Sequence, residues 1–462
     1  MGRTQSFVHL KPANAVATAR VGGKSPMLRV HLDRFPSVIG HCSNRINRRY
    51  NEDTYAINML KLPSLSQELA MLREGTDQCS EWRKSVLNLS IFDGHGGQGR
   101  VSKMLSEHLH TSIATASPTQ EQLFQLLEQY RNLIGGEYWE ELYAGREEFY
   151  TRFIKNCNTK QEQVLYKPEN SGSRMIFDKW GNIIDKTSLL HEQERLRLYY
   201  TFLKFDLDRC CGFAEANLPF SKRIEAYSGG STASSIFISS YEEQRSFDES
   251  FFVSPAGLLK LVVTQVGDTK IILCDQNGIA HSLTKAHHAS SLRESNRLHS
   301  NAAMQKDSFG DTRFLNNFAN TRSFGDLVAK PEGLTSEPDI YSYLIGGTLD
   351  LPHSERSKLQ FGGDECFICL ITDGVSDLMS DQELADLITS TVNLRGLKVG
   401  TPQYVAEEVI KYIMAIGGRH ADNATCLILR LPNWGNWPNL DRTGAARESK
   451  LLDASQGDRT DD

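Results

Sequence analysis

Four acidic residues stand where strand-like segments begin or end, and together they indicate a metal site. They are Glu52, Asp93, Asp373 and Asp422. Carboxylates that gather in a protein interior repel one another, and a divalent cation neutralises such a group most economically. Because no histidine or cysteine ligands accompany them, the hard cations Mg²⁺ and Mn²⁺ suit this all-oxygen donor set best. The simpler alternative is four independent turn caps, each of which is plausible alone.

The segment around Asp93 carries the strongest local signal. An apolar strand over residues 89–92 runs directly into Asp93, Gly94 and His95, and two more glycines follow. Glycine removes the side chains that would keep a phosphate, a metal or another strand away from this backbone. An isolated Asp-Gly pair is more often an ordinary turn, so the other acids decide its interpretation.

The elements that must position these acids are strands and capped helices. A strand of the buried type over residues 366–372 ends at Asp373, with Asp377 one helical turn later, and Asp422 precedes a strand over residues 426–430. Helix starts are indicated by three capping sequences, which begin at Ser117, Ser380 and Thr401.

Two β-branched runs, residues 258–266 and 269–274, are joined at Gly267 and Asp268. Their close spacing predicts an antiparallel meander, because a parallel crossover needs a dozen or more residues. Residues 137–227 are instead rich in Glu, Lys, Arg and Tyr. We interpret that stretch as an inserted helical cap.

Composition limits the class of protein. The chain has 462 residues, 39% of them hydrophobic, and no apolar run approaches the roughly 18 residues that a membrane span requires. A net charge of −6 gives no support to nucleic acid as a partner. Nine cysteines, an odd number scattered along the chain, do not indicate a disulfide framework, so a reducing compartment fits better.

The two ends of the chain differ from its middle. Residues 1–44 contain six basic residues and one acid, a composition typical of a mitochondrial transit peptide, although a disordered basic tail would have the same composition. Residues 433–462 are polar, and we expect this tail to be disordered. Length alone would suggest about three domains.

Seven ordered blocks make the chain resemble the metal-dependent serine/threonine protein phosphatases, the protein phosphatase 2C (PPM) family. They are Arg48 with Glu52-Asp53, residues 92–97, residues 229–233, residues 266–268, residues 321–326, residues 372–374 with Asp377, and Asp422-Asn423. The resemblance implies one α+β domain over residues 45–432, built as a central antiparallel β-sandwich flanked by helices in the order α-β-β-α. The basic leader and the helical insertion are most similar to the fungal mitochondrial branch.

The resemblance also implies the metal ligands. Asp93 would bridge two Mg²⁺ or Mn²⁺ ions, Asp373 and Asp422 would complete one site, and Glu52 with the carbonyl of Gly94 would complete the other. Asp268 and Asp377 match positions that can hold a third, weaker ion together with Asp373. Asp53 would brace the ligands from behind.

The implied reaction is hydrolysis of phosphoserine and phosphothreonine in phosphoproteins by a water molecule that two cations activate. Arg48 would bind the phosphate oxygens as a planar fork. His95 would protonate the departing serine or threonine oxygen. We expect a monomer whose substrates are mitochondrial phosphoproteins, pyruvate dehydrogenase being the first candidate by analogy, or else a cytoplasmic or nuclear enzyme.

Two alternatives compete with this interpretation. His41, Cys42 and Arg48 fit the His-Cys-x5-Arg spacing of cysteine-dependent phosphatases, but such a loop needs glycine and a thiolate of low pKa. The second alternative is a pseudophosphatase that keeps the fold as a protein-binding regulator and uses residues 137–227 as its contact surface. Intact acids at every metal position argue against it.

Overall fold

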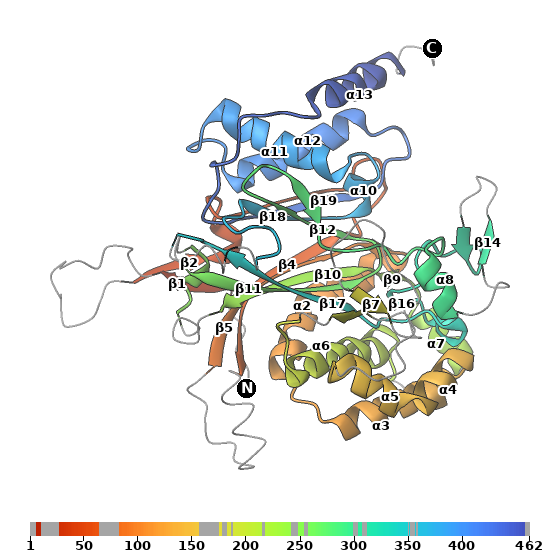
Figure 1. The fold of residues 1–462 in the computed structure, drawn as a ribbon. Coiled ribbons are helices and arrows are strands. Elements are labelled where there is room, and N and C mark those ends of the chain that lie inside the picture. Colours follow the sequence, from red (N-terminus) through yellow and green to blue (C-terminus); the bar gives the residue numbers. More distant parts are fainter. Residues whose placement is uncertain are drawn as a thin grey trace.

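The computed structural model describes residues 6–10, 27–63, 83–156, 175–177, 183–185, 188–214, 218–241, 248–253, 257–298, 304–306, 312–349, 351, 356 and 359–457. Figure 1 shows two β-sheets stacked in the middle of the molecule, with one group of helices below them and another above. This arrangement confirms the predicted α+β architecture of a β-sandwich flanked by helices. No helix among the described residues is long and apolar enough to cross a membrane.

Both main sheets have five strands, and all of their pairings are antiparallel. The first sheet runs in the order β17 (Asp339–Gly346), β11 (Leu258–Val266), β10 (Ala233–Ser240), β5 (Arg83–Phe92) and β4 (Thr54–Pro63). The second runs in the order β13 (Ala280–Ser282), β12 (Lys270–Cys274), β18 (Phe367–Ile371), β19 (Ala424–Arg430) and β3 (Ile39–Asn44).

Alternating side chains build one core between the sheets and one on each outer face. In β5, Leu87, Leu89 and Ile91 point into the core between the sheets, whereas Val86 and Phe92 point toward the helices below. Successive side chains of a strand face opposite sides, so a strand with buried apolar residues on both faces is covered on both faces.

The lower helical layer covers the first sheet. It consists of α2 (Arg100–Thr115), α3 (Gln120–Leu133), α4 (Glu137–Ala144), α5 (Arg146–Phe149), η3 (Tyr150–Ile154), α6 (Glu192–Phe205), the π-helical turn η4 (Asp206–Cys210) and α7 (Phe220–Ala226). Much of the stretch that we predicted as an insertion therefore lies in this layer and shares its core with the first sheet.

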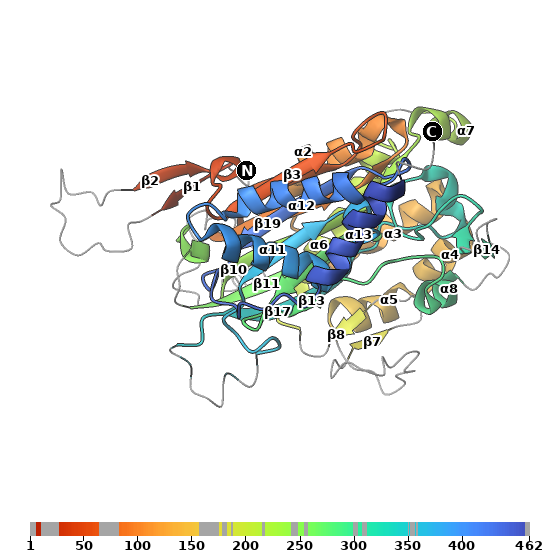
Figure 2. The same ribbon diagram turned by 90° about the horizontal axis from the view of Figure 1, so that it is seen from above.

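The upper layer lies across the strands of the second sheet (Figure 2). It contains α11 (Asp381–Arg395), α12 (Pro402–Ile416) and α13 (Gly444–Gly457), and the short α10 (Asp373–Ser376) follows β18 directly. Ser380 and Thr401 cap α11 and α12 as predicted. The cap of α3 is Thr119 and not Ser117, because Thr119 and Gln122 form the reciprocal capping box.

The remaining elements are short. Three two-residue strands form a small sheet in the order β16 (Phe324–Gly325), β9 (Gly230–Ser231) and β6 (Gly94–His95). The pairs are β1 (Phe7–Leu10) with β2 (Leu28–His31), β7 (Met175–Phe177) with β8 (Ile183–Asp185), and β14 (Met304–Lys306) with β15 (Thr312–Phe314). The short helices are η1 (Leu32–Arg34), η2 (Gly97–Gly99), η6 (Phe251–Val253), α8 (Leu292–Leu298) and η7 (Leu327–Glu332).

The predicted meander through Gly267 and Asp268 is wrong in one respect. The strands β11 and β12 exist as expected, but β11 belongs to the first sheet and β12 to the second. The chain crosses between the sheets at Gly267, whose φ of 96° would strain a larger residue, and whose added Cβ would lie 2.5 Å from Thr232. Spacing alone predicted a hairpin because it cannot distinguish a turn within one sheet from a crossing between two.

The predicted boundary of the leader at residue 44 is also wrong. Strand β3 lies inside that stretch and pairs with β19 along its length, from Asn44 opposite Ala424 to Ile39 opposite Leu429. Val8 is fully buried in the core between the sheets. The amino-acid composition shows that this segment is basic, but it cannot show that part of the segment pairs with a strand that is distant in the sequence. Residues 1–5 and 11–26 of the leader lie outside the described residues.

The polar tail after residue 432 is not disordered as we expected, since the structure describes it to residue 457 as a turn and helix α13. Trp434 and Trp437 are buried and stack edge to face against each other and against Phe367. Asp386 of α11 accepts hydrogen bonds from the backbone nitrogen of Arg442 and from Thr443. Two large aromatic side chains outweigh the polar average of the segment.

Candidate active site

A cavity of about 620 Å³ lies at one end of the sandwich, where both sheets contribute strand ends. Asp93 follows β5, Asp268 follows β11 and Asp373 follows β18, while Glu52 precedes β4 and Asp422 precedes β19. All five line this cavity, together with Arg48, Gly94 and His95. The structure therefore brings the predicted catalytic residues and metal ligands to one place, with the exception of Asp377.

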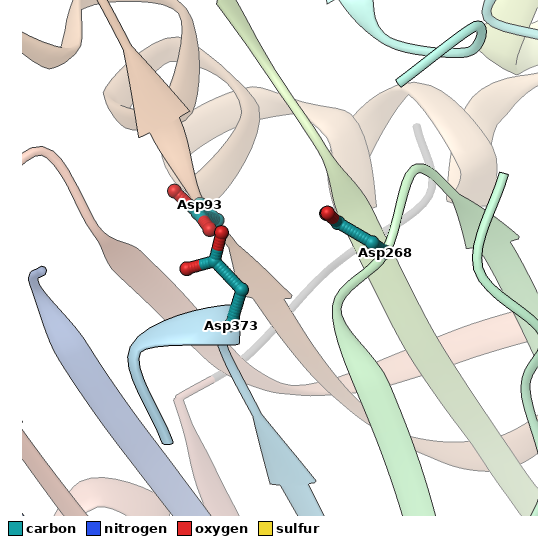
Figure 3. Close-up of side chains that lie close together, drawn as sticks. All are labelled: Asp93, Asp268 and Asp373. Carbon is teal, nitrogen blue, oxygen red and sulfur yellow. The ribbon is translucent and has the colours of Figure 1, made fainter. Parts of the chain in front are cut away.

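Three of the carboxylates that line the cavity lie close together (Figure 3). One oxygen from each of Asp93, Asp268 and Asp373 lies within 4.8 Å of the other two. The side chains of Asp93 and Asp373 lie next to each other, and Asp268 points toward them from the neighbouring strand end. Three negative groups at this separation favour either a bound cation or protonation.

The pKa values of the three carboxyl groups are shifted in different directions, because each group has different neighbours. Burial and the nearby charges of Asp373, Asp53 and Asp268 raise the pKa of Asp93 well above its usual value. Burial, followed by the charge of Asp268, raises the pKa of Asp373 to about 8. Asp268 behaves differently: although burial opposes it, a hydrogen bond from His288 at 2.9 Å lowers its pKa.

The remaining predicted ligands line the rim. Arg48 Nη2 lies 2.7 Å from Asp422 Oδ2, and both side chains are about half exposed, at 54% and 44%. The backbone of Glu52 is held from two sides, because its nitrogen donates to Asn423 Oδ1 and its carbonyl accepts from Ser102 Oγ. These bonds fix where the chain presents Glu52 to the cavity.

Asp53, the predicted bracing residue, does not line the cavity and is buried. Its Oδ2 accepts hydrogen bonds from Thr372 at 2.9 Å and Thr425 at 2.8 Å, one residue away from Asp373 and three away from Asp422. Burial raises its pKa to about 6 despite these bonds. Asp377 does not line the cavity, although burial and the charge of Asp268 raise its pKa.

Sequence reasoning missed two side chains at the site. Asp326 Oδ2 lies 2.7 Å from His95 Nε2 and also accepts a hydrogen bond from Ser323. His288 binds Asp268. Asp326 belongs to one of the seven recognised blocks, so its position was available, but no spacing connects it to His95. Nothing in the sequence marks His288.

The cysteine-dependent alternative finds no support at Cys42. This residue lies in β3 opposite Cys426, and burial with the neighbouring Cys426 raises the pKa of its thiol to about 11. A nucleophilic cysteine needs a lowered pKa. Arg48, the arginine of that motif, instead contacts Asp422.

The chain is similar to known proteins of the protein phosphatase 2C type. The family model described as protein phosphatase 2C matches residues 169–422, more than half of the chain. Protein phosphatase 2C homolog 4 of Schizosaccharomyces pombe is 28% identical over 412 residues, which cover 88% of this chain and 84% of that protein. Protein phosphatase 1K, mitochondrial, of Xenopus laevis is 29% identical over 38% of this chain and 41% of that protein. A serine-threonine phosphatase 2C structure from Toxoplasma gondii aligns with a TM-score of 0.44 and 13% identity, covering 85% of this chain and 94% of that one.

Proposed function

Because the chain belongs to the protein phosphatase 2C family of serine/threonine protein phosphatases, we propose that it hydrolyses phosphoserine and phosphothreonine with two divalent cations, Mg²⁺ or Mn²⁺. The observation that carries this proposal is the cluster of Asp93, Asp268 and Asp373, whose oxygens lie within 4.8 Å of one another. Three carboxylates so close together repel one another unless a cation or protons neutralise them.

The donor set suits divalent cations. All the candidate ligands are oxygens, burial and then the charges of neighbouring carboxylates raise the pKa values of Asp93 and Asp373, and Asp268 Oδ1 is buried without a hydrogen-bond partner. Asp93 would contact both ions, Asp373 and Asp422 one of them, and Glu52 and the Gly94 carbonyl the other. Asp268 and Asp377 are the candidates for a third. When bound, two such cations acidify a water molecule and neutralise phosphate charge.

Arg48 would bind the phosphate group. Its guanidinium is half exposed at the rim of the cavity, where a phosphate entering from solvent would meet it. A planar guanidinium can donate two parallel hydrogen bonds to phosphate oxygens, which fixes the orientation of the group as well as its place.

His95 would protonate the oxygen of the departing serine or threonine. An alkoxide is a poor leaving group, so a proton must reach it as the bond to phosphorus breaks. Although burial lowers the pKa of His95, the charge and hydrogen bond of Asp326 raise it overall, which favours the protonated donor. The same contact with Asp326 fixes the orientation of the imidazole ring.

Mitochondrial phosphoproteins, with pyruvate dehydrogenase as the first candidate, are the substrates we propose. The basic composition of residues 1–44 and the similarity to a mitochondrial relative support this. The fission yeast relative that spans most of the chain supports a place in a fungal branch. We further propose that a single phosphatase domain, with residues 137–227 as a helical insertion, carries the whole site, because the parts of the site come from both sheets.

Hydrolysis of a phosphoserine peptide by the full chain, with Mn²⁺, Mg²⁺ or EDTA, tests the proposal. We expect activity only with metal, and a loss of more than about a hundredfold in Asp93→Asn, beyond what removal of an outer-shell partner costs. Cys42→Ser is the matched control and should retain activity. Activity in EDTA that disappears in Cys42→Ser would show that the wrong catalytic centre was chosen.

A further inference from the structure

The lower helical layer holds the chain segment that carries Asp326. This segment runs from Ser323 through β16 to η7, and Asp326 is the residue between β16 and η7. The segment packs against η4 through β16 and against α4 through η7. These contacts join the helical layer to a residue that binds His95.

Asp206 of η4 makes the central contact. Its Oδ1 accepts a hydrogen bond from the backbone nitrogen of Gly325 at 2.7 Å, and its Oδ2 lies 2.8 Å from Lys330 Nζ and 3.0 Å from the hydroxyl of Tyr130. The side chains of Asp206 and Lys330 are fully buried. Lys330 in turn donates to the carbonyl of Ser323 at 3.0 Å. One carboxylate therefore binds the segment on both sides of Asp326.

Helix α4 holds the same segment from another direction. Trp139 Nε1 donates to the carbonyl of Lys330 at 2.8 Å. Gly136, at the start of α4, lies so close to Pro331 that an added Cβ would be 1.8 Å from its carbonyl oxygen. No larger residue fits at this contact, so helix and segment are packed backbone to backbone.

The small three-stranded sheet connects this segment to the proposed catalytic residue His95. Gly325 of β16 pairs with Gly230 of β9, which pairs with His95 of β6. The backbone nitrogen of Asp326 donates to Gly229 at 3.0 Å, and Asp326 Oδ2 lies 2.7 Å from His95 Nε2. A displacement of Gly325 would therefore move Asp326 and His95 together.

We propose that Asp206 is a positioning residue of the phosphatase reaction, through which the helical layer fixes Asp326 and thereby His95. This inference rests on the proposed function, and it gives residues of the predicted insertion a role as a scaffold for the active site. Asp206 touches neither substrate nor metal ligand, so its removal should disturb geometry and leave binding intact. A misplacement of about 1 Å can cost a reaction on the order of a hundredfold.

The test compares Asp206→Asn with Asp386→Asn. Asp386 is an equally buried carboxylate that accepts hydrogen bonds from Gln382, the Arg442 backbone and Thr443, but it lies in the upper helical layer. An asparagine at 206 keeps one acceptor oxygen for three donors and leaves the charge of Lys330 unpaired. Both variants lose a buried charge and should lower thermal stability. A difference in catalysis between them therefore reflects the positions of the two residues, in the lower and the upper helical layer.

Steady-state kinetics and hydrogen exchange of the full chain provide the readouts. We expect kcat of Asp206→Asn to fall about tenfold or more with KM within about twofold, while Asp386→Asn stays within about twofold in both. Amide exchange in residues 323–332 should accelerate in Asp206→Asn only. Equal kcat in the two variants, or unchanged exchange in this segment, would overturn the inference.

A second variant tests the inference even if Asp206→Asn fails to fold. Asp206→Leu/Lys330→Met replaces both charges by apolar side chains of similar size, which a buried pair often tolerates, and still removes the acceptor for Gly325. It should fold and show the same loss in kcat, and normal kcat here would contradict the inference. If the unmodified protein fails to hydrolyse phosphopeptides while Asp206→Asn accelerates exchange, the proposed function fails and the positioning of the segment stands.

Discussion

Two groups of buried carboxylates lie in this molecule, and they have opposite electrostatics. In the acid cluster, burial and the charges of neighbouring carboxylates raise the pKa values of Asp93 and Asp373. In the second group, Glu294 and Asp339 are fully buried, more so than Asp93 and Asp373, yet arginines lower their pKa values well below the usual range. Burial alone therefore does not decide the protonation state of these groups.

The difference comes from the cations that the protein itself provides. Glu294 Oε2 lies 2.8 Å from Arg297 Nε, and its Oε1 lies 3.0 Å from Arg322 Nη2. Arg293 forms a bidentate contact with Asp339. At the acid cluster only His288, on Asp268, offers such a partner among the described residues. A carboxylate group that the fold leaves without a countercharge is the place where a cation from solution fits.

Removing one charge from the arginine-paired group should have the largest effect on stability. Glu294→Gln removes the carboxylate that contacts Arg297 and the nearer of the two carboxylates that contact Arg322, and breaking such a buried pair costs about 3–5 kcal/mol. Urea unfolding measures the change. Glu128→Gln, at an exposed ion pair with Arg131, is the control and should cost less than about 1 kcal/mol. A small effect at Glu294 would mean that the arginines find other partners.

Replacing a carboxylate by an amide in the acid cluster should raise the free energy of unfolding instead of lowering it. Because folding raises the pKa of Asp373 to about 8, its carboxyl group must bind a proton at pH 7 in EDTA, and Asp373→Asn removes this cost. We therefore expect the free energy of unfolding to rise by on the order of 1–3 kcal/mol, since one pKa unit corresponds to about 1.4 kcal/mol. Urea unfolding in EDTA and in Mg²⁺ separates the two states. The variant should also lose most of the stabilisation by Mg²⁺, and a destabilised variant in EDTA would contradict the comparison.

The pH dependence of stability should show the smallest difference. The pKa of Asp373 rises from 3.8 to about 8 on folding, so its contribution to stability is greatest below pH 3.8 and is lost as pH rises through 8. Between pH 6 and 7 in EDTA, unfolding free energy should fall by about 1 kcal/mol. Glu294 and Asp339, with lowered pKa values, contribute no slope there because both states are ionised.

Mg²⁺ provides the control for this slope. A divalent cation binds the ionised carboxylates, so saturating Mg²⁺ should stabilise the protein more at pH 7 than at pH 6 and flatten the curve. Asp373→Asn should show a shallower slope in EDTA than the unmodified chain. A slope of the same size in both proteins would assign it to groups outside the cluster.

The local sequence predicted helix starts correctly where hydrogen bonds between residues a few positions apart determine them. The capping residues Ser380 and Thr401 fix the starts of α11 and α12 through bonds to residues only three positions away. The cap of α3 moved from Ser117 to Thr119 because two capping sequences overlap there and only one can form the box with Gln122. Polar composition failed for the tail, where Trp434 and Trp437 find a surface formed by another part of the chain.

Residue types and their order along the chain indicate the kind of chemistry: acids at strand ends, Arg48 and His95 near them, and the blocks of one phosphatase family. Which acids meet depends on the packing of the two sheets. Asp93 and Asp373 end strands in different sheets, and Asp268 reaches them because the chain crosses between the sheets at Gly267. Asp326 reaches His95 through a sheet of two-residue strands. Residue type and local spacing are set by neighbours in the chain, whereas these contacts depend on how distant strands pack their alternating faces.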